Sequence, residues 1–111
     1  MESSLLQRRI LEYLYNYEKQ FPGGRVRVSS LKGEFKKSFK EICSAINFLN
    51  QDRYIFLFFL QDESGNIVDG EVGVNRKGIQ LIEDRGKFNQ KFSLGAADVA
   101  NFLKYLLNQD K

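Results

Sequence analysis

The chain has 111 residues, of which 42% are hydrophobic, and it carries a formal net charge of +3 with a pI near 9.0. This length allows one hydrophobic core without metals or disulfides, and a single cysteine excludes an intramolecular disulfide. Without histidine, the chain lacks the commonest general base and the usual partner of a nucleophilic cysteine. We therefore expect no enzymatic activity, no cofactor and no metal site.

The sequence favours a cytoplasmic protein. It opens without a signal peptide, and the lone Cys43 fits a reducing compartment. The longest apolar run, Tyr54 to Leu60, has seven residues, whereas a membrane-spanning helix needs about 20. We expect no membrane partner, and the length also suits one domain of a larger protein.

The first elements are predicted to be a helix and a short strand. Apolar residues at three- and four-residue spacing between Leu6 and Tyr17 predict a helix capped by Ser3 or Ser4. The following Phe-Pro-Gly-Gly run ends it. The segment 25–28 alternates arginine and valine, which predicts a short strand with the valines inward and the arginines in solvent.

Two more helices are predicted next, joined by a tight turn. Ser29 or Ser30 is placed to cap a short helix over residues 31–36, with Glu34 completing a capping box. Ser38 is placed to cap a third helix. Its inner stripe is predicted to contain Phe39, Ile42, Cys43, Ile46 and Leu49. Two helices joined in this way form a helix-turn-helix unit.

A β-hairpin follows. Tyr54–Gln61 is crowded with aromatic residues and predicts a strand, and residues 64–66 (Ser-Gly-Asn) predict a turn. A second strand is expected over Ile67–Val74, with the hairpin tip spanning Asp62–Asp69. Both faces of the first strand are apolar, so we expect a second layer to cover it.

The end of the hairpin carries a family resemblance. The turn Asn75-Arg76-Lys77-Gly78, followed by two apolar residues, is similar to the threonine-x-lysine-glycine turn of MarR- and PadR-type regulators and of small YjcQ-like proteins. Asn75 stands where those families have threonine. The resemblance covers residues 5–84 and implies an α+β fold, a winged helix-turn-helix, with a helical turn starting near Ile79. YjcQ-like proteins also continue past the wing with a helical tail.

The C-terminal part is expected to add one more helix. Nine of the twelve residues from Ala96 to Leu107 are apolar, which is too many for one buried stripe. We therefore divide the chain into a winged-helix domain, 1–84, and an extension, 85–111. The extension either closes the monomer core or forms a homodimer. The expected dimer interface contains Val99, Phe102, Leu103, Tyr105 and Leu106.

Charge is unevenly distributed along the chain. The segment 25–40 has six basic residues and one acid, a balance of +5, whereas Gln61–Glu71 has four carboxylates and no base, a balance of −4. The basic residues are Arg25, Arg27, Lys32, Lys36, Lys37 and Lys40, and the carboxylates are Asp62, Glu63, Asp69 and Glu71. Each group could simply be a solvated face.

The winged-helix resemblance implies a DNA-binding transcriptional regulator with its third helix in the major groove of double-stranded DNA. Lys36, Lys37, Ser38 and Lys40 are then expected at phosphate and sugar, and Ser44 and Asn47 at base edges, with Glu41 as a further candidate there. Arg25 and Arg27 are expected beside the duplex and Arg76 near the base of the wing.

An acidic wing argues against this interpretation, because four carboxylates brought toward phosphates repel them. The alternative is a protein-interaction module that binds a partner chain through its acidic wing and apolar C-terminal helix. Cys43 is interpreted as a small core residue rather than a redox sensor.

Overall fold

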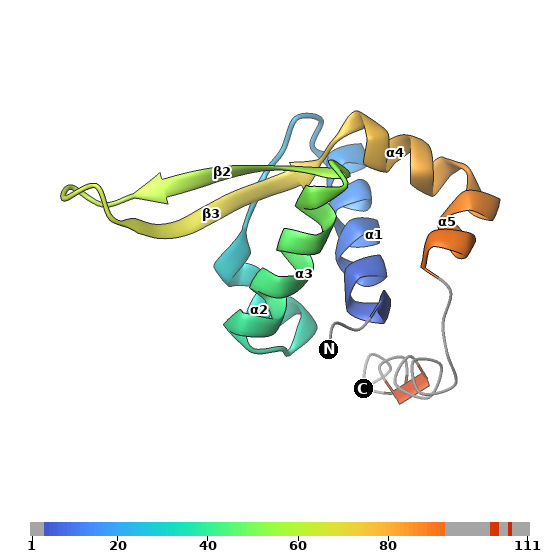
Figure 1. Ribbon diagram of the computed structural model, residues 1–111, viewed down its shortest axis with the longest axis horizontal. Coiled ribbons are helices and arrows are strands. Elements are labelled where there is room, and N and C mark those ends of the chain that lie inside the picture. Colours follow the sequence, from blue (N-terminus) through green and yellow to red (C-terminus); the bar gives the residue numbers. More distant parts are fainter. Residues whose placement is uncertain (1–3, 93–102, 105–106, 108–111) are drawn as a thin grey trace.

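The computed structural model describes residues 4–92, 103–104 and 107. Within them the chain forms an α+β fold in which helices pack together at one end and a long β-hairpin projects from the other (Figure 1). The helices are α1 (Ser4–Gln20), α2 (Leu31–Phe35), α3 (Phe39–Gln51), α4 (Arg76–Glu83) and α5 (Arg85–Lys91), and a 3-10 turn, η1 (Val28–Ser30), precedes α2. The strands are β1 (Val26–Arg27), β2 (Ile55–Gln61) and β3 (Ile67–Val74).

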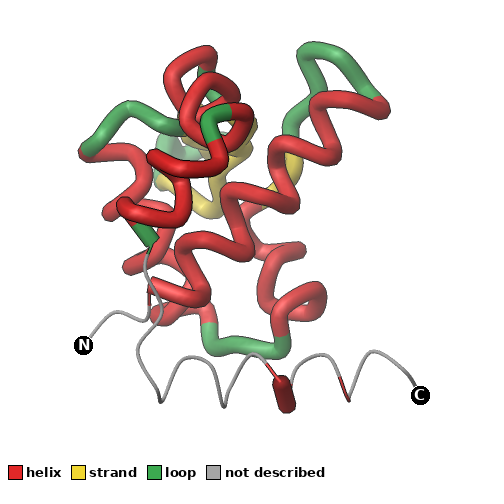
Figure 2. The backbone as a smooth tube through the Cα atoms, turned by 90° about the vertical axis from the view of Figure 1, so that its right-hand side faces the viewer, coloured by secondary structure: helices red, strands yellow, loops and turns green. Residues whose placement is uncertain are grey.

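The three strands form one antiparallel sheet in the order β1-β3-β2. Ile55 lies opposite Val74 at the base of the hairpin and Gln61 opposite Ile67 near its tip, with a register shift between Leu60 and Gln61. The short β1 pairs with the inner half of β3 only. Seen after a 90° turn, the strands lie behind the helices, so the hairpin points away from the helical body (Figure 2).

The core lies between α1, α3 and the inner half of the sheet. Ile10 on α1, Ile42 on α3 and Val72 on β3 are each fully buried, as the three- and four-residue spacing on the helices predicts. Phe88 of α5 and Phe92 just after it belong to the same core. The domain boundary expected after residue 84 therefore falls between α4 and α5. The aromatic rings that follow this boundary complete the core of the winged-helix part.

The predicted caps of the two central helices have opposite outcomes. At α3 the prediction is confirmed, because the Ser38 hydroxyl accepts a hydrogen bond from the Glu41 backbone N–H and the Glu41 side chain accepts one from the Ser38 backbone N–H. At α2 it is wrong, because Ser30 has helical backbone angles and makes no side-chain cap. The 3-10 turn η1 leads directly into α2, so the backbone is already helical at Ser30. The Ser30 hydroxyl donates to the Arg27 carbonyl instead.

The turn that carries the family resemblance is the N-terminus of α4. Its helix begins at Arg76, earlier than expected, because the Asn75 side chain caps it by accepting a hydrogen bond from the Arg76 N–H at 2.8 Å. The Asn75 N–H donates to the Tyr54 carbonyl at 2.9 Å. A Cβ atom on Gly78 would lie 2.2 Å from the same carbonyl oxygen. Glycine therefore lets α4 pass directly against the start of the hairpin.

No helix in the described part of the chain is long and apolar enough to cross a membrane. The expected C-terminal helix and four of the five expected dimer-interface residues lie outside the described residues. Leu103 is described, is helical, and has 54% of its surface exposed.

Candidate nucleic-acid interface

Three lysines gather at the turn between α2 and α3. Lys36, Lys37 and Lys40 are all exposed. Lys36 has a left-handed backbone conformation, with φ of 53°, and ends α2, while the Lys37 N–H donates to the Lys32 carbonyl at 3.2 Å. This tight turn brings the lysines to the N-terminus of α3. A helix N-terminus carries partial positive charge, so the lysines and the helix both favour an anion here.

The exposed side of α3 offers few groups for reading base edges. Asn47 is exposed and Ser44 is half-buried, so Asn47 is the more accessible of the two. Ser38 and Glu41 are occupied with each other in the capping box. Hydrogen bonds from the Ser38 backbone and hydroxyl lower the pKa of Glu41, which keeps it ionised as a cap. We therefore remove Glu41 from the base-reading candidates.

The two arginines of the basic segment lie in and beside β1, the edge strand that pairs with β3. Both are exposed, as the alternating pattern predicts. The Arg25 guanidinium lies 3.7 Å from the Glu71 carboxylate and 4.9 Å from the centre of the Phe58 ring. Arg27 lies one residue before η1 and its charge acts on Asp69. Arg25 is thus engaged with the wing, while Arg27 is closer to the α2–α3 unit.

Arg76 lies apart from the lysine group. It follows Asn75, whose side chain donates to the Arg53 carbonyl at 3.4 Å, just beyond the C-terminus of α3. The lysines lie at the other end of the same helix. A 13-residue α-helix is about 20 Å long, so Arg76 and Lys40 cannot contact the same phosphate.

The carboxylates expected at the wing tip are divided between two places. Only Asp62 and Glu63 lie at the tip, where Asp62 accepts hydrogen bonds from the Ser64 and Asn66 N–H groups. Asp69 and Glu71 lie in β3, where Asp69 is bonded to Ser29 and Glu71 is near Arg25. The expectation of four carboxylates at the tip is therefore wrong. It failed because a linear charge count does not show that β1 and η1 fold against β3.

Phe39 is a residue that the sequence pattern misplaced. It was expected in the inner stripe of α3, yet 42% of its surface is exposed. Phe39 is the first residue of α3, and this end of the helix extends past the core. The Lys32 ammonium lies 5.8 Å from the centre of the Phe39 ring. Its position directly after the cap residue Ser38 could have indicated that the ring lies outside the core. The lysine turn therefore includes an exposed aromatic ring.

Cys43 is half-buried among core residues and has no disulfide partner. Burial raises the pKa of its thiol, and the negative charge of Asp69 raises it further. A thiol that stays protonated at neutral pH is a poor nucleophile. This environment suits a small core residue.

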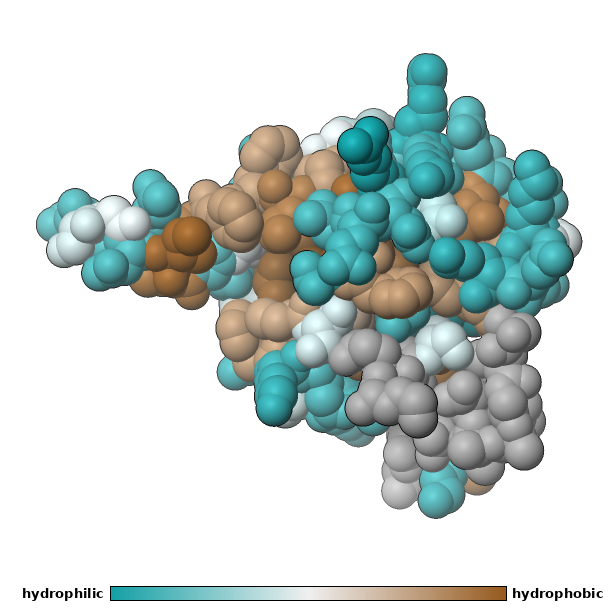
Figure 3. Space-filling model, in the orientation of Figure 1, coloured by the Kyte–Doolittle hydropathy of each residue, from teal (hydrophilic) through white to brown (hydrophobic). Residues whose placement is uncertain are grey.

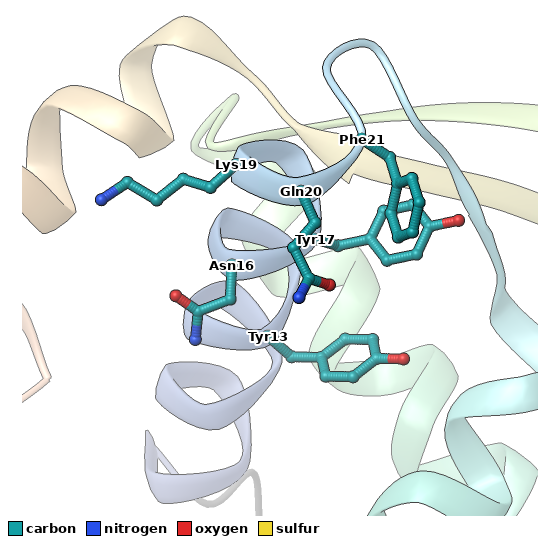
Figure 4. Close-up of a pocket in the computed structure, with 6 residues that line it drawn as sticks. All are labelled: Tyr13, Asn16, Tyr17, Lys19, Gln20 and Phe21. Atoms are coloured by element: carbon teal, nitrogen blue, oxygen red, sulfur yellow. The ribbon is translucent and has the colours of Figure 1, made fainter.

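A shallow groove of about 530 Å³ runs along the C-terminal half of α1. Figure 4 shows the rings of Tyr13, Tyr17 and Phe21 on one side of the helix and Asn16 and Lys19 on the other. The Tyr17 and Phe21 rings lie 5.0 Å apart. In the described residues there is no cluster of carboxylates and cysteine suited to a metal ion.

The arrangement of these elements matches known structures. A MepR mutant from a multidrug-resistant S. aureus clinical isolate superposes with a TM-score of 0.56 at 14% identity, covering 93% of this chain and 73% of that one. A Lactococcus lactis ZitR mutant superposes with a TM-score of 0.54 at 12% identity, covering 100% and 76%. The fold is a winged helix. In its terms α2 and α3 are the helix-turn-helix unit and the β2–β3 hairpin is the wing.

A second S. aureus MepR mutant superposes with a TM-score of 0.53 at 15% identity, covering 93% of this chain and 74% of that one. The sequence matches no family model and no curated protein. At these identities the winged-helix match concerns the fold, which confirms the fold class expected from the sequence.

Proposed function

We propose that this winged-helix chain binds double-stranded DNA as a transcriptional regulator, with α3 in the major groove. The carrying observation is the α2–α3 turn, where Lys36, Lys37 and Lys40 are exposed together at a helix N-terminus. Within residues 4–92 none of these lysines is ion-paired with a carboxylate. Their charges are therefore available to phosphates.

Two further points support the proposal. The resemblance of the Asn75–Gly78 turn to MarR- and PadR-type regulators agrees with the fold shared with MepR and ZitR. Asp69 and Glu71 are engaged with Ser29 and Arg25, which reduces the negative charge that the wing presents. We assign Lys36, Lys37 and Lys40 to the phosphate and sugar backbone, with Ser38 beside them as the cap that holds the start of α3, and Asn47 and Ser44 to base edges.

The remaining basic residues have separate roles in this proposal. Arg27 lies beside the helix-turn-helix unit and is assigned to the backbone of the duplex. Arg25 contributes less, because Glu71 shares its charge. Arg76, at the far end of α3, reaches only a different part of the duplex. A homodimer through the C-terminal residues, including the exposed Leu103, would present two such surfaces to paired half-sites.

The test is fluorescence anisotropy with a labelled random duplex at low and near-physiological salt. Changing Lys36, Lys37 and Lys40 together to alanine should abolish binding near physiological salt and reduce the slope of log K against log salt by about 3. A matched control removes three exposed lysines elsewhere, Lys19, Lys87 and Lys104, and so has the same net charge.

The control should bind almost as the unmodified protein does. Equal losses of DNA affinity in the two variants would mean that only net charge matters, and would contradict a DNA-binding surface at the α2–α3 turn. Unmodified protein that fails to bind DNA even at low salt would reject the proposal and favour the alternative, a protein-interaction module.

A further inference from the structure

Strand β2 forms an unprotected edge of the sheet. It pairs with β3 on one side, and no other described strand lies on its second side. The outward backbone N–H and C=O groups of such an edge are a template for another strand, and soluble proteins usually protect it with charges or proline. The sequence of β2, Ile-Phe-Leu-Phe-Phe-Leu-Gln, contains neither.

Large apolar side chains are exposed along the same hairpin. Phe58 is 50% exposed and Phe59 is 62% exposed, and these neighbours point to opposite faces of the sheet. Ile67 and Val68 on β3 are also exposed. Figure 3 shows this apolar surface continuing from the helical body along the wing and ending before the hydrophilic tip. A patch that includes both faces and the edge fits a strand partner better than a helix laid on one face.

We propose that β2 pairs antiparallel with β2 of a second copy of this chain, about a two-fold axis at Phe58. Phe58 is the central residue of Ile55–Gln61. The two three-stranded sheets then become one sheet of six strands. Phe58 lies opposite Phe58 of the second copy and Leu57 opposite Phe59, so aromatic and aliphatic side chains meet on both faces.

The charges that flank β2 favour a second copy of this chain as the partner strand and favour pairing about Phe58. Arg53 lies two residues before the strand and Glu63 two residues after it. Both are exposed, and within residues 4–92 neither is ion-paired. Each lies in the turn that borders one end of β2, so the two-fold axis at Phe58 brings the end of the strand that carries Arg53 in each copy toward the end that carries Glu63 in the other.

Other registers lose this match. An axis at Leu57 would place Arg53 opposite Gln61, and an axis at Phe59 would move it past Glu63 toward the turn at Gly65, so in both registers Glu63 is only a diagonal neighbour of Arg53. β2 is thus complementary to itself both in its apolar residues and in its flanking charges. An unrelated strand would share only the apolar part.

The test uses sedimentation velocity of the full chain over a range of concentrations, with two single variants, Arg53→Glu and Glu63→Arg. Each variant places like charges at both symmetry-related contacts and should weaken self-association about tenfold. An equimolar mixture of the two restores opposite charges at both contacts. The mixture should therefore associate about as strongly as the unmodified protein, as should the double variant.

Thermal unfolding by circular dichroism serves as the folding control, because both changed side chains are exposed and the folded monomers should be equally stable. Phe58→Lys, which places two ammonium groups opposite each other at the axis, should abolish the self-association that the two charge variants weaken. A monomeric unmodified chain overturns the proposal. So does an association that neither single variant weakens, or one that the mixture fails to restore, since the contact would then lie elsewhere or in another register.

Discussion

The Asp69 carboxylate joins the wing to the entrance of the helix-turn-helix unit through Ser29. It accepts hydrogen bonds from the Ser29 hydroxyl at 2.5 Å and from the Ser29 N–H at 3.2 Å. A third bond comes from the Gly70 N–H at 2.8 Å. The wing is therefore anchored to η1 by a charged group that the linear sequence assigns only to an acidic segment.

This anchor predicts a dependence of stability on pH. Although burial alone raises the pKa of Asp69, the hydrogen bonds from Ser29 and Gly70 outweigh it and hold that pKa below its ordinary value of 3.8. A carboxyl with a lower pKa in the folded state contributes stability above its unfolded pKa and loses it as pH falls toward the folded pKa.

Asp69→Asn should therefore lower the free energy of unfolding by about 1 kcal/mol at pH 7 and flatten the loss of stability below about pH 4. Urea denaturation at several pH values measures both effects. Glu34→Gln, at an exposed carboxylate with no hydrogen bond in the described residues, is the control and should leave the free energy of unfolding at pH 7 nearly unchanged. If the free energy of unfolding falls equally steeply below about pH 4 in Asp69→Asn and in the unmodified protein, this role of Asp69 is contradicted.

The capping box at α3 predicts a contrast between two serines. Ser38→Ala removes the acceptor for the Glu41 N–H and should lower the free energy of unfolding by about 1 kcal/mol. Ser30→Ala removes a hydroxyl that caps no helix and should cost less than about 0.5 kcal/mol. Thermal denaturation distinguishes them. Equal costs would mean that Ser30 also acts as a cap in solution.

Two glycines predict opposite effects of the same substitution. Gly78→Ala places a Cβ atom 2.2 Å from the Tyr54 carbonyl oxygen, a backbone atom that cannot move without shifting the base of the wing. We expect a loss of about 2–4 kcal/mol. A Cβ atom on Gly33 meets nothing within 4 Å. Gly33→Ala in α2 should stabilise the protein by about 0.5–1 kcal/mol. A neutral Gly78→Ala would show that the α4 contact is looser than the geometry indicates.

The aromatic rings after residue 84 predict cooperative unfolding. Phe88 is fully buried, and its ring centre lies 5.4 Å from that of Phe92. Phe88→Ala should cost about 3–5 kcal/mol in a single transition that includes the winged helix. Phe21→Ala, at an exposed ring, is the control and should cost below about 1 kcal/mol. Two separate transitions, with only one sensitive to Phe88→Ala, would support an independent extension from residue 85.

Regular elements were predictable wherever a local pattern decides them. The stripe on α1, the Ser38 cap and the apolar run of β2 each depend on residues within one or two turns or along one strand. The failures arose where a distant element determines the local state. Ser30 continues a 3-10 turn rather than capping α2, and Phe39 precedes the part of α3 that the core covers.

The sequence by itself determined the order of the helices and strands, because hydrophobic period and turn residues act over a few neighbouring positions, and its resemblance to known regulators implied the winged helix. It also predicted that lysines gather around the start of α3. Only the tertiary structure decided which charges remain available. The pairing of β1 with β3 brings Arg25 to Glu71, and η1 brings Ser29 to Asp69. Charges interact according to distance in space, which separation along the chain does not report.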